Sequence, residues 1–192
     1  EDEDRLHAGV FESIADVARP WIGLAGMRLD PRTNAPHDTS FETGLVLRDL
    51  EGTQQRRVTL PEGARIGNVV WSHHDKLFAF TLVKEDEVEL WTCDAVELVP
   101  RRVAQGLNTL FDEFQWMPDG NGLIFNLSQD DGIKLISGDI YFAYADGSGV
   151  YNITNSPDVI ELNPTISPDG KSISYEVDGQ IFTADINEIL PR

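Results

Sequence analysis

The sequence of 192 residues is poor in cysteine and in basic side chains, and it has no long apolar run. Cys93 is the single cysteine, so neither an intramolecular disulfide nor a cysteine-based metal site can form. No stretch approaches the roughly 20 apolar residues of a transmembrane helix. The chain has 15 Lys and Arg residues and 33 Asp and Glu residues, which gives a net charge of −18. Because few cations are available to replace counterions on phosphate, the predicted partners include neither nucleic acid nor a membrane.

The sequence does contain short strand patterns separated by tight turns, most clearly between residues 163 and 186. Ser167-Pro168-Asp169-Gly170 is a typical turn, since Pro fixes φ, Asp can bind its own backbone and Gly accepts positive φ. Residues 172–175 then alternate polar and apolar side chains, as a half-buried strand does. Asp178-Gly179 is a two-residue hairpin signal before another strand pattern at 180–186.

This unit recurs earlier in the chain, beginning at Trp116 and, with its Pro and Gly replaced, at Trp71. The starts at residues 71, 116 and 166 are separated by 45 and 50 residues. Repeats of about 40–50 residues made of short strands are typical of β-propeller blades. We therefore predict an all-β chain. A β-sandwich with similar turns is the alternative, although a sandwich needs no self-similar spacing.

We expect residues 1–192 to form one propeller domain of about four blades, each a four-stranded antiparallel sheet. An N-terminal tail and a short helix at 10–18 occupy residues 1–20, and the expected blade units are 21–70, 71–115, 116–165 and 166–192. This count leaves three arrangements open. In the first, the chain forms a small four-bladed ring completed by an N-terminal strand. In the second, it forms half of a larger ring that a second copy closes in a homodimer. In the third, it is part of a longer protein.

Residues capable of chemistry are present but do not form a recognisable motif. A metal site usually needs three or four convergent ligands, whereas the four histidines are scattered in turn and loop patterns at His7, His37, His73 and His74. Residues 130–132 and 146–149 lack the spacing of a calcium loop and are better explained as hairpin turns. The prediction is therefore no catalytic residue, no cofactor and no metal, with the binding residues left open.

Other residue types have simple structural interpretations. Arginine can grip a carboxylate with two hydrogen bonds, but in so acidic a chain we expect pairing with Asp and Glu for Arg28, Arg32, Arg56, Arg57, Arg101 and Arg102. The aromatic residues near the repeat starts are predicted to form the core between blades, namely Trp71, Phe114 and Trp116. Cys93 lies in a strand pattern and is predicted to be a small buried apolar residue.

Two resemblances to known families follow from local motifs. The first part of the chain resembles the N-terminal propeller of prolyl-oligopeptidase-type serine peptidases. The likeness is carried by residues 13–20 and 24–34, by Ile66-Gly67-Asn68-Val69-Val70-Trp71-Ser72 and by Glu89-Leu90-Trp91. The closest branch is acylaminoacyl- and glutamyl-peptidase-like, and the likeness covers about residues 10–120. From about 137 to 190 the chain is similar to TolB-like propeller repeats, through Gly138-Asp139-Ile140-Tyr141, residues 145–149 and Ser167-Pro168-Asp169-Gly170-Lys171. The change of resemblance between 120 and 137 also permits a recombined origin.

The peptidase resemblance implies a propeller that covers a separate α/β-hydrolase domain with a Ser-Asp-His triad and a Gly-x-Ser-x-Gly elbow. This sequence contains no such elbow, so no catalytic residue can be transferred to it. We therefore expect a non-catalytic propeller that serves as a scaffold or binding module for protein or peptide partners. One alternative is a fragment or subunit of such a peptidase, gating access to a hydrolase domain that is not in this chain. The other is a TolB-like envelope interaction module, which predicts a periplasmic or secreted location; an extracytoplasmic address is favoured over a cytoplasmic one.

Overall fold

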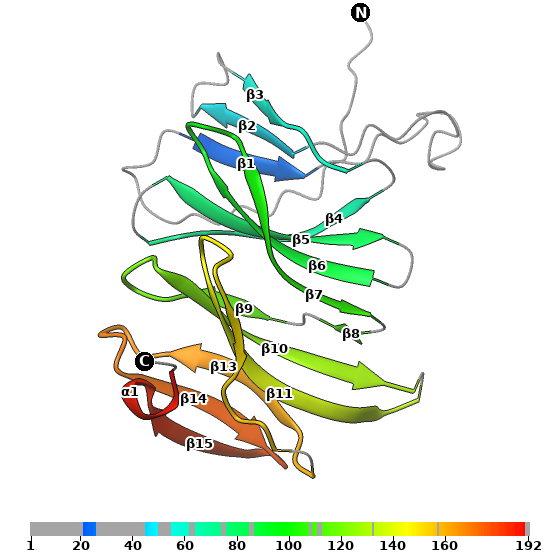
Figure 1. The fold of residues 1–192 in the computed structure, drawn as a ribbon, viewed down its shortest axis with the longest axis vertical. Coiled ribbons are helices and arrows are strands. Elements are labelled where there is room, and N and C mark those ends of the chain that lie inside the picture. Colours follow the sequence, from blue (N-terminus) through cyan, green and yellow to red (C-terminus); the bar gives the residue numbers. More distant parts are fainter. Residues whose placement is uncertain are drawn as a thin grey trace, which may run out of the picture.

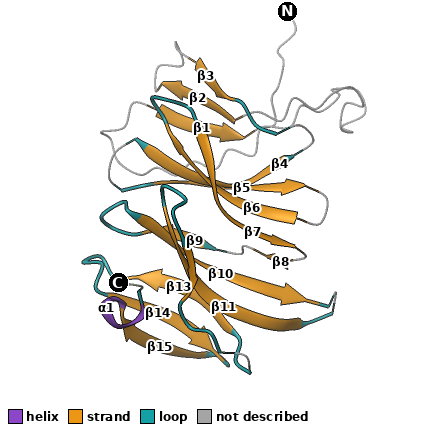
Figure 2. Ribbon diagram, viewed as in Figure 1, coloured by secondary structure: helices purple, strands orange, loops and turns teal. Residues whose placement is uncertain are grey.

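The computed structural model describes residues 21–25, 45–49, 55–61, 64–73, 76–84, 87–107, 109–110, 113–131, 133–156 and 158–190. Within these ranges the chain forms fifteen strands and one single-turn helix, as Figure 2 shows. Every strand pairs antiparallel with its neighbours in sheets built from strands that are consecutive in the sequence. The predicted all-β fold is therefore confirmed, and the predicted helix at 10–18 lies outside the described residues.

The strands are grouped into four sheets. The first contains β1 (Trp21–Ala25), β2 (Leu45–Asp49) and β3 (Gln55–Val58). The second contains β4 (Arg65–Trp71), β5 (Leu77–Lys84), β6 (Glu87–Asp94) and β7 (Pro100–Leu107). The third contains β8 (Thr109–Leu110), β9 (Phe114–Trp116), β10 (Gly122–Asp130), β11 (Leu135–Tyr144) and β12 (Val150–Asn152). The fourth contains β13 (Glu161–Ile166), β14 (Ser172–Val177) and β15 (Gln180–Asp185), and helix α1 (Ile186–Ile189) follows it.

The four sheets follow one another along the longest axis of the molecule (Figure 1). The sheet of β1–β3 lies at one end of this row and the sheet of β13–β15 at the other. The blade count agrees with the prediction, but the described sheets form an open row, so the small closed ring is not what the structure shows. The repeat starts read from the sequence, Trp71, Trp116 and Ile166, are the last residues of β4, β9 and β13. Each of the last three sheets therefore begins a few residues earlier than its repeat start. The division of residues 1–192 into one domain of blade units stays a prediction.

The repeat seen in the sequence has a direct structural counterpart in backbone hydrogen bonds. At the same point of each repeat an amide donates to the carbonyl five residues later, from Ser72 to Leu77, from Met117 to Gly122 and from Ser167 to Ser172. The distances are 2.9, 2.9 and 2.8 Å. These bonds close the turn before the second strand of the second, third and fourth sheets. The weakened sequence copy at residue 71 thus keeps the geometry of the two complete copies.

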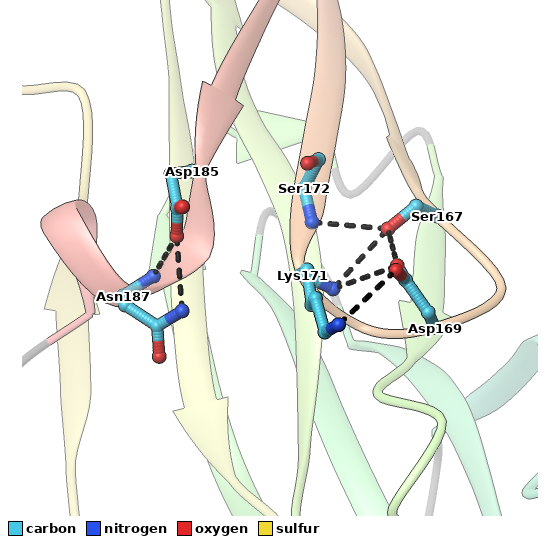
Figure 3. Close-up of polar contacts among 6 residues, drawn as sticks. All are labelled: Ser167, Asp169, Lys171, Ser172, Asp185 and Asn187. Carbon is cyan, nitrogen blue, oxygen red and sulfur yellow. Dashed lines mark hydrogen bonds and ion pairs between the residues drawn. The ribbon is translucent and has the colours of Figure 1, made fainter.

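The turn of the last repeat shows how its side chains fix the backbone (Figure 3). The Ser167 hydroxyl donates to Asp169 Oδ1 at 2.7 Å and accepts from the amide of Ser172 at 3.0 Å. Asp169 Oδ1 also accepts from the amide of Lys171 at 3.1 Å. The hydrogen bond from Ser167 holds the pKa of Asp169 below its usual value. Gly170 has a φ of +70°, so the glycine of this motif supplies a conformation that L-residues rarely adopt.

The core consists of three apolar clusters, each between two successive sheets. The first joins β2 and β3 to the second sheet and includes Leu45, Leu47, Val58, Phe78, Phe80, Leu82 and Cys93. The second joins the second and third sheets and includes Ala79, Leu90, Val103, Phe114, Trp116, Leu123 and Phe125. The third joins the third and fourth sheets with α1, through Met117, Ile124, Ile140, Phe142, Ile173 and Ile186. Because β5 and β10 send alternate side chains into different clusters, both faces of the two middle sheets are buried, as in stacked blades.

The outward face of the fourth sheet is different. Its register places Ser172 opposite Asp185, Ser174 opposite Thr183, and Glu176 opposite Ile181. Ile181 is the apolar member of these pairs and is 70% exposed. This face therefore offers little apolar surface for another sheet to cover.

One predicted loop is much shorter than expected. The sequence predicts a connection over residues 128–138. In the structure β10 extends to Asp130 and β11 begins at Leu135, and the two strands pair with each other up to these residues. The Asp131 carboxylate accepts hydrogen bonds from the amides of Ile133 and Lys134 at 2.9 and 3.0 Å. A four-residue turn is therefore sufficient, because the Asp side chain supplies the turn contacts and the flanking polar residues remain in strands.

Candidate functional site

The larger of two concave features in the described part of the chain is a cleft of about 450 Å³ across the second, third and fourth sheets. It lies where β4, β9 and β13 end and the repeated turns begin. The three strand ends contribute Val70, Trp71, Gln115, Trp116 and Ile166, and the turns contribute His73, Pro118, Ser167 and Pro168. Equivalent positions of three repeats thus line one cleft: 71, 116 and 166 at the strand ends, and 73, 118 and 168 in the turns.

Two hydrogen bonds hold the floor of this cleft and tie successive sheets together. The Trp116 indole Nε1–H donates to the backbone carbonyl of Val70 at 3.0 Å. The Gln115 side-chain oxygen accepts from the amide of Ile166 at 3.2 Å. Trp116 is only 4% exposed, so most of its ring is core and the floor is rigid. Trp71 is half-buried and packs on Phe78 with a ring-centroid distance of 5.1 Å.

The rim of the cleft carries the groups that a ligand meets first. His73 and Pro168 are exposed, while Pro118 and Ser167 are half-buried. Among the described residues that line the cleft, His73 is the one with a titratable side chain, whereas the chain as a whole is strongly acidic. Two tryptophans and two prolines offer flat apolar surface, and Gln115, Ser167 and His73 are the polar members of the lining.

Ser167 is the hydroxyl residue among the described residues that line the cleft. Its hydroxyl donates to Asp169 and accepts from the amides of Lys171 and Ser172. This set of hydrogen bonds shapes the turn, and no described histidine contacts the hydroxyl as it would in a Ser-His pair. Among the residues that the structure describes, no three His, Cys, Asp or Glu side chains come together as metal ligands. No described helix has both the length and the apolar character needed to span a bilayer.

The structure places the arginines in structural roles. Arg102 pairs with Glu89 at 2.6 Å, as the sequence predicts. Arg56 donates to the backbone carbonyls of Ala95, at 2.8 Å, and Val96, so it ties β3 to the second sheet. Arg101 is exposed near Asp146, whose pKa is lowered mainly by the Ser148 hydroxyl and only slightly by Arg101. Arg28 and Arg32 lie outside the described residues.

Several other sequence predictions can be compared with the structure. Phe114 and Trp116 are buried between sheets and Trp71 packs against the first cluster, which confirms the predicted core. Cys93 is 2% exposed, and burial, helped by Asp94, raises the pKa of its thiol to about 12. Asp131 and Asp146 act in hairpin turns. His7, His37 and His74 lie outside the described residues, whereas His73 reaches the cleft as well as the turn.

Sequence reasoning did not identify the cleft. It assigned Trp71 and Trp116 to the core and His73 to a turn, and it did not consider Gln115 or Pro118. The signal was present, because these residues occupy equivalent places in the repeats. Only the stacking of the sheets shows that such places meet in one cleft.

Comparisons with known proteins agree with this architecture. No family model matches the chain. Over 62% of its length the chain is 30% identical to a probable chloroplastic glutamyl endopeptidase of Arabidopsis thaliana, and over 58% it is 30% identical to one of Oryza sativa subsp. japonica. It spans only 14% and 13% of these curated relatives.

Among solved structures, TolB from Acinetobacter baumannii is similar with a TM-score of 0.53 and 22% identity, over 89% of this chain and 39% of that one. A prolyl endopeptidase is similar with a TM-score of 0.58 and 18% identity, over 87% of this chain and 27% of that one. At these identities the structural likeness concerns the fold. The chain therefore has a β-propeller fold of the kind found in TolB and in prolyl endopeptidases.

Proposed function

We propose that this chain is a non-catalytic binding module that holds a peptide or a protein segment in the cleft across β4, β9 and β13. The observation that carries this proposal is the composition of the cleft. Three repeats contribute equivalent residues to one surface whose described lining includes two tryptophans, two prolines and no Asp, Glu, Lys or Arg, within a molecule of net charge −18. A row of equivalent positions from successive repeats suits an extended chain, whose side chains also recur at a regular spacing.

The lining also indicates which peptides should bind. Trp71, Trp116 and the two prolines provide apolar contact, and aromatic side chains bury large areas at small cost in conformational entropy. A neutral segment rich in proline and aromatic residues fits this surface best. An acidic segment would be repelled by the surrounding carboxylates. A basic segment would be attracted to the whole surface and not to the cleft in particular.

Peptide titration followed by two-dimensional NMR tests the proposal. Ten-residue peptides of three kinds are compared, neutral with alternating Pro and Phe, acidic and basic, at about 0.5 M salt where surface charge is largely screened. We expect saturable shifts of the Trp71 and Trp116 indole signals with the neutral peptide only. Pro168→Ala and His73→Ala should weaken binding several-fold, whereas Trp91→Phe, outside the cleft, should not. Equal binding by all three peptides, or no effect of the cleft variants, would refute the proposed site.

A second candidate function follows from the curated relatives. The chain spans 14% of a glutamyl endopeptidase, so it could serve as the propeller of a longer peptidase and gate access to a hydrolase domain. Under this hypothesis the cleft contacts substrate on its way to that domain. An assay with glutamyl and acyl-peptide substrates tests whether this chain is itself catalytic, which neither candidate predicts. We expect no turnover by this chain alone, and turnover abolished by a serine-reactive inhibitor would overturn the non-catalytic assignment. The similarity to TolB supports an envelope interaction module as a third candidate.

A further inference from the structure

A second, smaller pocket lies between the third and fourth sheets and shares no lining residue with the cleft. It measures about 150 Å³, and Ile153, Thr154 and Ser156, which follow β12, form part of its lining. One end is polar and contains Thr154, Ser156 and Glu161. The remaining wall is largely apolar and includes Ile173, from β14, and Ile189, from α1. The pocket is thus amphipathic, with a carboxyl group at one end.

Asp139, from β11, is the acidic neighbour of this pocket, and donors already surround it. Its Oδ1 accepts from the amide of Ser156 at 3.0 Å and from the hydroxyl of Thr154 at 3.5 Å. Its Oδ2 accepts from the side-chain amide of Asn152 at 3.0 Å. Asp139 lies close enough to Glu161 to act on it electrostatically.

Glu161 is in the opposite situation. It is 4% exposed, and its Oε2 is buried without a hydrogen-bond partner among the described residues. Burial raises the pKa of Glu161, and the charge of Asp139 raises it further, although hydrogen bonds from Thr154 and Ser156 act in the opposite direction. A buried carboxyl oxygen without a donor is rare in folded proteins and calls for a group that supplies one.

Four kinds of partner could satisfy Glu161: water, a metal ion, a proton or an organic cation. A calcium ion takes six to eight oxygen ligands, but the described residues include no group of three acidic, His or Cys side chains that could hold a metal ion. Water or a proton would satisfy the carboxyl oxygen and leave the apolar part of the pocket unused. An ammonium group on a short carbon chain uses both ends, because its N–H bonds suit the carboxylate and its carbons suit the wall.

We propose that this pocket binds an alkylammonium group, with its nitrogen at the Glu161 carboxylate and its carbon chain against Ile173, Ala184 and Ile189. The volume agrees with this ligand, since an apolar cavity of about 150 Å³ accommodates benzene, which has more heavy atoms than n-butylammonium. The negative charge of Asp139 favours the cation over a neutral molecule of the same shape. Both a free amine and the side chain of a partner's lysine present this chemistry.

The test uses n-butylammonium chloride as the probe and methyl NMR of the full chain as the readout. At pH 7 we expect saturable shifts of the Ile153, Ile173, Ala184 and Ile189 methyl signals. n-Butanol has the same carbon chain without the charge and should bind at least tenfold more weakly. Glu161→Gln should weaken n-butylammonium binding at least tenfold. Glu188→Gln, an exposed residue of α1, removes the same charge and should leave binding unchanged.

Nα-acetyl-lysine amide distinguishes the two sources of the ligand. Tighter binding than n-butylammonium would identify a lysine side chain of a protein partner, and weaker binding would identify a free amine. The proposal is overturned if n-butanol binds as well as n-butylammonium, if calcium chloride shifts these methyl signals and the amine does not, or if no shift saturates.

A measurement on the wild-type chain keeps the test valid if Glu161→Gln does not fold. The carboxyl carbon signal of Glu161 is followed as a function of pH, with and without saturating n-butylammonium. Asp139 and Tyr175 are the titratable groups near Glu161 in the described structure. Because the amine binds the ionised carboxylate, it should lower the apparent pKa of Glu161. An unchanged titration would overturn the proposal.

Discussion

The hydrogen bond between Trp116 and Val70 gives a quantitative test of how neighbouring sheets are held together. Trp116→Phe keeps an aromatic ring in the second core cluster but removes the indole Nε1–H that donates to the Val70 carbonyl at 3.0 Å. Losing this hydrogen bond should cost about 1 kcal/mol. The ring also becomes smaller at a position that is 4% exposed, and the resulting cavity should cost a further 1–2 kcal/mol or so.

We therefore expect Trp116→Phe to lower the free energy of unfolding by about 2–3 kcal/mol, which corresponds to a Tm decrease of roughly 4–12 °C for a chain of this size. Denaturant unfolding followed by circular dichroism measures it. Trp91→Phe is the matched control, because its indole donates at 3.0 Å to Glu89, two residues away on the same half-exposed strand, where water can replace it. Equal losses in the two variants, or a loss below about 0.5 kcal/mol for Trp116→Phe, would refute the argument that this contact between sheets stabilises the row.

Three further predictions follow from individual residues. Because burial raises the pKa of the Cys93 thiol to about 12, iodoacetamide should label it at pH 8 only in denaturant; rapid labelling of the folded chain would contradict its place in the core. Because the pKa of Glu161 is raised in the folded protein, its carboxyl group holds a proton more tightly there than in the unfolded chain. Glu161 therefore contributes to stability near pH 4, and this contribution is lost as pH rises. Urea unfolding at pH 5 and pH 7 should therefore show a smaller loss of stability with rising pH in Glu161→Gln than in the wild type, and identical pH dependence would exclude this role. A Cβ at Gly122 would lie 2.4 Å from the Phe142 ring, so Gly122→Ala should cost about 2–3 kcal/mol in thermal unfolding. Gly179→Ala meets no atom within 4 Å and should cost only about 1 kcal/mol, from its φ of +74°.

The two proposed binding sites use different chemistry and fail independently. The described lining of the cleft contains no titratable side chain other than His73, and the proposed ligand there is an apolar peptide, whereas the ligand proposed for the pocket at Glu161 is a cation. Neutral peptides that shift the Trp71 and Trp116 signals should leave the Ile173 and Ile189 methyl signals unchanged. Binding at one site therefore gives no support to the other, and each experiment has its own readout.

Much of the fold could be predicted because it depends on local rules. The Asp178-Gly179 hairpin, the turn at Gly170 and the alternation of β14 are properties of a few adjacent residues, and the structure contains all three. The spacing of the starts at 71, 116 and 166 then predicted repeated blades, which the three equivalent turn hydrogen bonds confirm. The connection predicted over 128–138 was wrong. Its polar residues have the composition of a loop, but most of them pair as parts of β10 and β11.

The binding features could not be predicted in the same way, because they depend on which repeats become neighbours. The sequence by itself determined an acidic, all-β chain of repeated short strands, with tryptophans at the repeat starts and a single cysteine in a strand. Only the tertiary structure brought Gln115 next to Ile166, 51 positions away, and Pro118 into the same cleft as Pro168. It also placed Glu161 in a pocket with Thr154 and Ser156, close to Asp139. The physical reason is that turns and strands are set by local backbone preference, whereas a cleft or a buried carboxyl group is set by how whole sheets pack.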